Sequence, residues 1–90
     1  MPVAVREVKI VNRLGMHARP AMQFVETASR FRSQVAVHKG DEKVNGKSIM
    51  EMMMLAAMPG TRLRLEAVGD DAAPCLDALE KLVREKFHED

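Results

Sequence analysis

The sequence predicts an α+β domain in which helices cover one face of a mostly antiparallel sheet. Two observations support this class. Segments that are rich in β-branched residues or alternate in polarity lie between segments whose apolar residues recur every three to four positions. The segments also mix without the regular strand–helix alternation of a parallel sheet. The predicted order is β-α-β-β-α-β-α, over residues 3–10, 18–29, 34–39, 43–45, 47–57, 61–68 and 72–87.

Length and composition fit one domain spanning residues 1–90. Ninety residues leave no room for a second core. The formal net charge is +1 and the basic residues lack interleaved aromatics, so nothing favours a nucleic-acid or membrane partner. No apolar run approaches the roughly 20 residues that cross a bilayer. The single cysteine, Cys75, excludes an internal disulfide and fits a reducing compartment.

The predicted strands indicate which side chains face the core. In the first strand, the face that carries Val8 and Ile10 is expected to point inward. The last strand alternates most clearly between apolar and charged residues, which is typical of a half-buried strand. Because Gly40-Asp41 is a turn signal, the second and third strands are expected to pair as a hairpin.

The helix predicted over residues 47–57 carries more apolar residues than one face can bury. Ser48 is a good N-cap and Glu51 stands three residues later, which forms a capping box. The residues expected to face inward are Ile49, Met52, Leu55 and Ala56, which leaves Met50, Met53 and Met54 partly exposed. Such methionines fit a docking surface or a cover over a shallow core equally well.

The stretch Gly15-Met16-His17-Ala18-Arg19-Pro20 places a histidine at the start of the first helix. Glycine marks a turn, and proline is tolerated in a first helical turn. The first N–H groups of a helix are unpaired and its dipole is positive there, so this end can bind phosphate. A phosphoryl group on a nucleophilic His17 would be stabilised by the N–H groups of Ala18 and Arg19 and by the Arg19 guanidinium. Position alone also fits a simple surface or capping histidine.

The other reactive residues form no recognisable site. His38 and His88 lack metal-ligand spacing to His17 or Cys75, so no metal site is predicted. Cys75 has no histidine close in sequence and is expected to be a packing residue. The acidic residues are scattered and include no obvious acid–base pair.

Two motifs together resemble the family of histidine-containing phosphocarriers (HPr) of the bacterial phosphoenolpyruvate-dependent phosphotransferase system. The active-site signature of this family resembles Gly15-Met16-His17-Ala18-Arg19-Pro20-Ala21. Its regulatory signature resembles Val44-Asn45-Gly46-Lys47-Ser48-Ile49-Met50. The resemblance extends over essentially the whole chain, and two motifs at matching spacing are far more specific than either alone.

This resemblance implies a fold and a chemistry. The fold would be an open-faced β-sandwich, in which three helices cover one face of a four-stranded antiparallel sheet with strand order 1-4-2-3. Enzyme I would phosphorylate His17 on Nδ1, and Arg19 would support the phosphoryl group. His17 would then pass the group to IIA domains of sugar permeases. The protein would be a cytoplasmic carrier that needs no cofactor and has no turnover of its own.

The resemblance also implies a partner surface and a regulatory site. Met16, Ile49, Met50 and Met53 would form the surface shared by donor and acceptors. Ser48 would be the target of a regulatory kinase, with a phosphorylase to reverse the modification. A carrier that must expose His17 to several partners is expected to be a monomer.

Some residues depart from the family pattern. Met16 replaces the usual leucine or isoleucine and keeps an apolar contact, whereas Leu14 stands where many members carry a small polar residue. Glu51 stands where the regulatory signature often has glycine. Residues 52–57 (MMMLAA) also resemble the nitrogen-regulatory branch of the family, which carries phosphate to regulatory acceptors.

Two other functions differ from sugar-linked carriage. One is a regulatory binding module switched at Ser48, because phosphorylation there would add negative charge beside a docking surface. The other is a small acyl-phosphate hydrolase on a similar plan, for which Asn45 beside Gly46 is the single supporting feature.

Overall fold

A four-stranded antiparallel sheet in the order β1-β4-β2-β3 organises residues 1–89, the part of the chain that this computed structural model describes. The strands are β1 (Val3–Lys9), β2 (Gln34–Lys39), β3 (Glu42–Asn45) and β4 (Arg62–Val68). The helices are α1 (Ala18–Ser29), α2 (Ile49–Met54) and α3 (Ala72–Arg84), followed by a short turn, η1 (Lys86–His88). The predicted fold class and strand order are confirmed.

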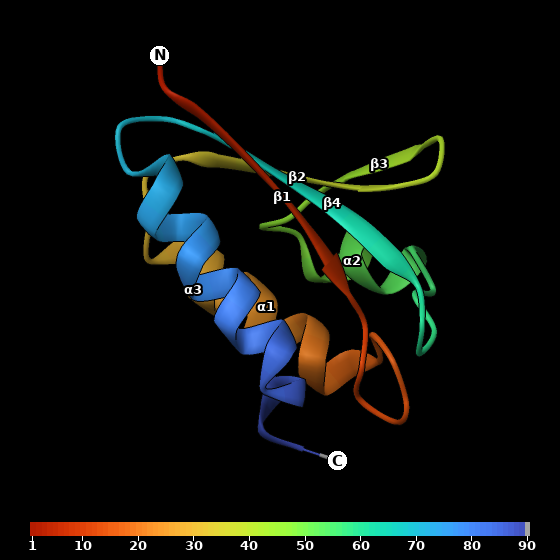
Figure 1. Cartoon of the computed structure of the whole chain (residues 1–90). Coiled ribbons are helices and arrows are strands. Elements are labelled where there is room, and N and C mark those ends of the chain that lie inside the picture. The colour runs from red at the N-terminus through yellow and green to blue at the C-terminus, as the bar shows by residue number, and fades with distance from the viewer. Residues whose placement is uncertain (90) are drawn as a thin grey trace.

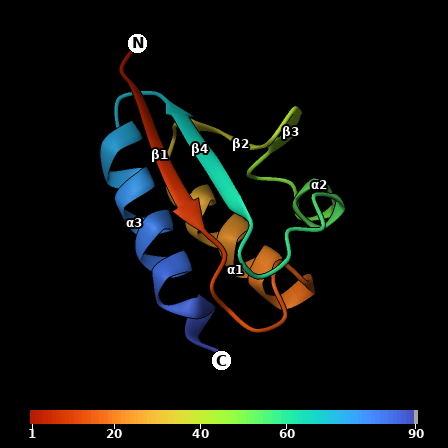
Figure 2. The same ribbon diagram turned by 45° about the vertical axis from the view of Figure 1, so that its right-hand side comes forward.

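The helices cover one face of the sheet and leave the other face open (Figure 1). Helices α1 and α3 run along the covered face, and α2 lies beside α1 near the β3 edge (Figure 2). Strand β4 lies in the middle and pairs antiparallel with both β1 and β2. The hairpin predicted at Gly40-Asp41 is confirmed, since β2 pairs antiparallel with β3.

Alternation along the strands decides which side chains reach the core. Strand β4 buries three apolar side chains, which alternate with the exposed Arg62 and Arg64 and the half-buried Glu66. The buried residues are Leu63, Leu65 and Ala67. Val8 in β1 and Ile10 just beyond it are also buried, which confirms the predicted inward face of the first strand.

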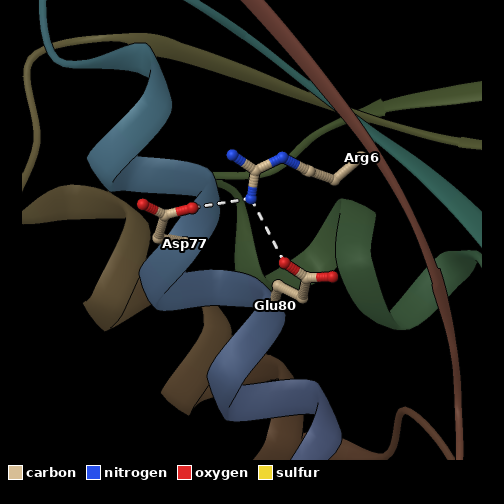
Figure 3. A network of polar contacts seen from close by, with 3 residues as sticks. All are labelled: Arg6, Asp77 and Glu80. Carbon is tan, nitrogen blue, oxygen red and sulfur yellow. Dashed lines mark hydrogen bonds and ion pairs between the residues drawn. The ribbon is translucent and has the colours of Figure 1, made fainter.

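An ion-pair network connects β1 to α3 (Figure 3). Arg6 Nη1 donates to Asp77 Oδ1 at 2.6 Å and to Glu80 Oε1 at 3.2 Å. The hydrogen bond to Asp77 is the main reason why the pKa of Arg6 lies above its ordinary value. Because solvent reaches 65% of the Asp77 side chain, this network orients α3 more than it stabilises the fold.

Helix α2 is shorter than the predicted helix over residues 47–57. It ends at Met54, and Ala56 adopts a left-handed φ of 50°, which breaks the helical periodicity. Met52 and Leu55 are buried as predicted. The predictions that Ile49 and Ala56 face inward are wrong, because Ile49 opens the short helix at its exposed end and Ala56 lies beyond its last turn.

The last helix also ends earlier than predicted. α3 stops at Arg84, and Lys86, Phe87 and His88 then take left-handed φ angles of 59°, 55° and 61°. Phe87 is fully buried in this turn. The turn changes the direction of the chain and brings Glu89 to the loop that precedes α1.

Candidate functional site

His17 is the N-cap residue of α1, where the sequence placed it. Its backbone is extended, and its carbonyl accepts the Ala21 N–H at 3.0 Å. Its side chain makes no capping hydrogen bond and is 37% exposed. The imidazole therefore stands at the positive end of the helix dipole, within reach of solvent and of a partner.

The loop before His17 is held by close backbone contacts. Gly15 adopts a φ of +71°, and a Cβ added there would lie 2.4 Å from the Ala57 carbonyl oxygen. The Met16 N–H donates to that same oxygen at 2.8 Å. Glycine is therefore required at this position by both its backbone angle and the space available.

The structure corrects the role expected for Met16. Its side chain is 4% exposed and packs in the core, so it presents almost no surface to a partner. The backbone bond to Ala57 explains this, because it fixes Met16 against the segment that follows α2. Leu14, in the same loop, is 60% exposed and presents an apolar side chain to solvent.

The ring of His17 contacts a carboxylate that the sequence did not reveal. Glu89 Oε2 lies 3.0 Å from His17 Nε2, and the Glu89 side chain is 18% exposed. Asn12 Nδ2 donates to the same Glu89 oxygen at 3.1 Å. The hydrogen bond with His17, followed by that with Asn12 and the positive charge of Arg19, lowers the pKa of Glu89 below its ordinary value.

The first turn of α1 offers the donors that a phosphoryl group would need. The N–H groups of Ala18 and Arg19 precede the first intrahelical donor, Ala21, and Pro20 carries no N–H. Arg19 is exposed. The start of α1 thus places the free N–H groups of Ala18 and Arg19 beside His17.

An exposed apolar surface surrounds α2. We call it the methionine surface; its members are Ile49, Met50, Met53, Met54 and Met58. Met50 and Met54 are the most exposed of them, at 74% and 72%. The Met58 backbone lies beside Gly15, so this surface continues to the loop that carries His17.

Ser48 is the N-cap of α2, and its predicted capping box is present in a modified form. Ser48 Oγ accepts the Glu51 N–H at 3.2 Å. The Glu51 carboxylate accepts the Asn45 N–H at 2.9 Å instead of the N–H of Ser48 itself. Lys47 Nζ donates to the Phe31 carbonyl at 2.7 Å, which connects the start of α2 to the segment that follows α1.

The remaining reactive residues lie elsewhere. Cys75 is fully buried as predicted, and burial raises the pKa of its thiol. His38 Nε2, on β2, lies 3.2 Å from Glu66 Oε1 on the neighbouring strand β4. Within residues 1–89, no group of three metal-ligating side chains is assembled. Over the same residues, none of the helices has the length and apolar character that a membrane span requires.

Comparison with known proteins decides the family. The family model described as "PTS HPr component phosphorylation site" matches residues 4–85. This chain belongs to the HPr family. The phosphocarrier protein HPr of Neisseria meningitidis serogroup A is 49% identical over 84 residues, which cover 93% of this chain and 94% of the relative. That of Treponema pallidum is 42% identical over 88 residues, which cover 98% of this chain and 100% of the relative.

Solved HPr structures share the fold. HPr-C-His from Thermoanaerobacter tengcongensis matches with a TM-score of 0.93 at 45% identity and covers 97% of this chain and 98% of that one. An HPr dimer from the same organism matches with a TM-score of 0.76 at 48% identity, covering 89% and 92%. The protein is therefore a phosphocarrier of the phosphotransferase system, which is a carrier role and not an enzymatic one.

Sequence reasoning missed Asn12 and Glu89, although both contact the site of this HPr protein. Glu89 is separated from His17 by 72 positions and from Asn12 by 77. No local pattern marks a residue whose role depends on a left-handed turn at the far end of the chain. The burial of Asn12 in the loop between β1 and α1 is also invisible in the sequence.

Proposed function

We propose that His17 accepts a phosphoryl group on Nδ1 from phosphorylated enzyme I and passes it to IIA domains. The observation that carries this proposal is the position of His17 at the start of α1, with Nε2 facing a carboxylate. A carboxylate only accepts hydrogen bonds, so Nε2 carries the proton and Nδ1 keeps a lone pair.

The chemistry then needs no proton transfer at the attacking nitrogen. The Nδ1 lone pair forms a bond to phosphorus, while the bond from phosphorus to the donor breaks and its electron pair stays with the donor. The N–H groups of Ala18 and Arg19 and the Arg19 guanidinium stabilise the charge on the phosphoryl oxygens. The reverse sequence delivers the group to an acceptor.

The methionine surface is the proposed docking site for donor and acceptors. It exposes flexible apolar side chains beside the loop of His17, which suits contacts with several different partners. Met16 is excluded from this surface by its burial. The other three residues that the resemblance assigns to the partner surface, Ile49, Met50 and Met53, all belong to it.

Ser48 is proposed as a site of regulatory phosphorylation. A phosphate on Ser48 would place two negative charges at the start of α2, beside the methionine surface. The Glu51 carboxylate already places a negative charge at the start of α2, where it accepts a hydrogen bond from the Asn45 N–H. Charge repulsion should therefore make this serine a poorer kinase substrate than one followed by glycine, and Glu51→Gly should increase its phosphorylation.

The carrier is proposed to act as a cytoplasmic monomer, because each partner needs access to His17. Sugar-permease IIA domains are the proposed acceptors, with nitrogen-branch regulators as the alternative suggested by residues 52–57. Only Met53, Met54 and Ala56 of that run reach the surface. Any contribution of this run to the choice between the two classes therefore depends on these three residues.

Incubation with enzyme I and labelled phosphoenolpyruvate tests the proposal. We expect one phosphate per chain that is labile in acid and stable in base, and none in His17→Ala. Transfer from the isolated phosphoprotein to a sugar-specific IIA domain or to a nitrogen-branch acceptor then identifies the branch. Mass spectrometry after treatment with the regulatory kinase tests the alternative: modification of Ser48 alone, with an inert His17, would support the Ser48-switched module.

A further inference from the structure

The end of the chain adopts a costly conformation that presents Glu89 to His17. Three successive residues without glycine, Lys86, Phe87 and His88, have left-handed φ angles. This conformation is unfavourable for each of them, so it persists where other contacts hold it. Full burial of Phe87 anchors the turn, and the His88 and Glu89 N–H groups donate to the carbonyls of Glu85 and Lys86. The result is a fixed place for the Glu89 carboxylate.

Asn12 holds that carboxylate from the other side. This side chain is fully buried, and Nδ2 uses both hydrogens, one toward the Gly15 carbonyl at 2.8 Å and one toward Glu89 Oε2 at 3.1 Å. Its Oδ1 is buried and has no hydrogen-bond partner within residues 1–89. Rotating the amide would set this oxygen against two acceptors, so the orientation is determined. Asn12 thus leaves one acceptor unsatisfied while it joins the His17 loop to Glu89.

From this geometry we infer that Glu89, held by Asn12, is a positioning residue that fixes the ring orientation and tautomer of His17. The inference rests on the proposed phosphoryl transfer and adds the groups that prepare its nucleophile. Because Glu89 Oε2 can only accept, Nε2 must donate, and Nδ1 is left with the lone pair that attacks phosphorus. When the bond from Nδ1 to phosphorus forms and the donor leaves with its electron pair, the ring gains positive charge. The Nε2 proton stays on the ring, bonded to Glu89.

The geometry specifies what each substitution should do. His17 and Asn12 both point to the same oxygen, so the position requires an acceptor more than a charge. Glu89→Gln can place its amide oxygen there and keep both bonds, whereas Glu89→Ala removes the acceptor. Glu85→Ala is the matched control. The Glu85 carboxylate lies 3.7 Å from Nδ1 of His88, on the same turn, and it belongs to a different ion pair from that of His17.

The first readout is the tautomer of His17, measured by ¹⁵N correlation spectra of the imidazole at about pH 9, where an ordinary histidine is neutral. Wild type, Glu85→Ala and Glu89→Gln should show the proton on Nε2. Glu89→Ala should show a mixture in which the tautomer protonated on Nδ1 increases. Circular dichroism establishes that each variant is folded.

The second readout uses potassium phosphoramidate, a small donor that needs no docking surface. Wild type and Glu85→Ala should be phosphorylated on Nδ1, and Glu89→Gln should slow by about threefold or less. Glu89→Ala should lose about tenfold in rate at Nδ1, which is the lower end of the loss seen when the hydrogen-bond partner of a metal-ligating histidine is removed. It should also gain phosphate on Nε2, and this shift in position would not arise from a general loss of stability.

Two results would overturn the inference. One is a wild-type His17 with its proton on Nδ1. The other is a Glu89→Ala variant that keeps both the wild-type tautomer and phosphorylation on Nδ1 alone. Neither readout uses enzyme I, so a wild-type protein that enzyme I fails to phosphorylate would refute the proposed function and leave this inference to be decided by the tautomer.

Discussion

Replacing Gly15 by alanine should both destabilise the protein and displace the loop that carries His17. The φ of +71° at this position costs alanine about 1–2 kcal/mol. The new Cβ would lie 2.4 Å from the Ala57 carbonyl oxygen, which is backbone and cannot rotate away. Relief requires Met16 and Ala57 to separate, and loss of their 2.8 Å hydrogen bond costs about 1 kcal/mol more.

These terms add to a loss of about 2–3 kcal/mol in the free energy of unfolding. For a chain of 90 residues this corresponds to a fall in Tm of roughly 10–25 °C. Gly40→Ala is the matched control, because Gly40 also has a left-handed φ of +57° but nothing lies within 4 Å of its added Cβ. It should lose only the backbone cost of about 1–2 kcal/mol that both positions share.

Thermal and urea unfolding followed by circular dichroism measure both variants. The two losses should differ by at least about 1 kcal/mol, and Gly15→Ala should also accept phosphate from enzyme I more slowly. Equal losses for Gly15→Ala and Gly40→Ala would refute the reasoning, because the contact with Ala57 would then contribute nothing.

Three further predictions concern the core, the docking surface and the acid stability. Met52→Ala should lower the free energy of unfolding by about 2–5 kcal/mol in urea titrations, since Met52 is fully buried. Met50→Asp should change that free energy by less than about 0.5 kcal/mol yet slow phosphorylation by enzyme I. Val3→Asp, at an exposed position of β1, should not slow it. The Ser33 hydroxyl, followed by backbone N–H groups, lowers the pKa of Asp71 from its ordinary 3.8. The resulting stabilisation is present above that value and disappears as the pH falls below it, so Asp71→Asn should flatten the acid limb of a plot of stability against pH.

The sequence predicted those elements whose signals are local. The helix predicted over residues 18–29 is confirmed, because Pro20 marks its first turn and its apolar residues keep one period. The capping role of Ser48 is confirmed for the same reason, since the bond to the Glu51 N–H spans three residues.

Features that depend on distant contacts were not predictable. The end of α2 depends on the left-handed Ala56, and nothing before Pro59 in the sequence marks a stop. Met16 is buried because its backbone binds Ala57, a contact across 41 positions that no spacing rule anticipates. The approach of Glu89 to His17 depends on a left-handed turn of non-glycine residues, which no sequence pattern predicts.

The position of the phosphoryl group after reaction with enzyme I and phosphoenolpyruvate tests the central claim most directly. Heteronuclear NMR that couples ³¹P to the ¹⁵N-labelled ring locates it on a single nitrogen. We predict one phosphoryl group on Nδ1 of His17 and none in His17→Ala. Phosphate on another residue, or full labelling of His17→Ala, would contradict the account.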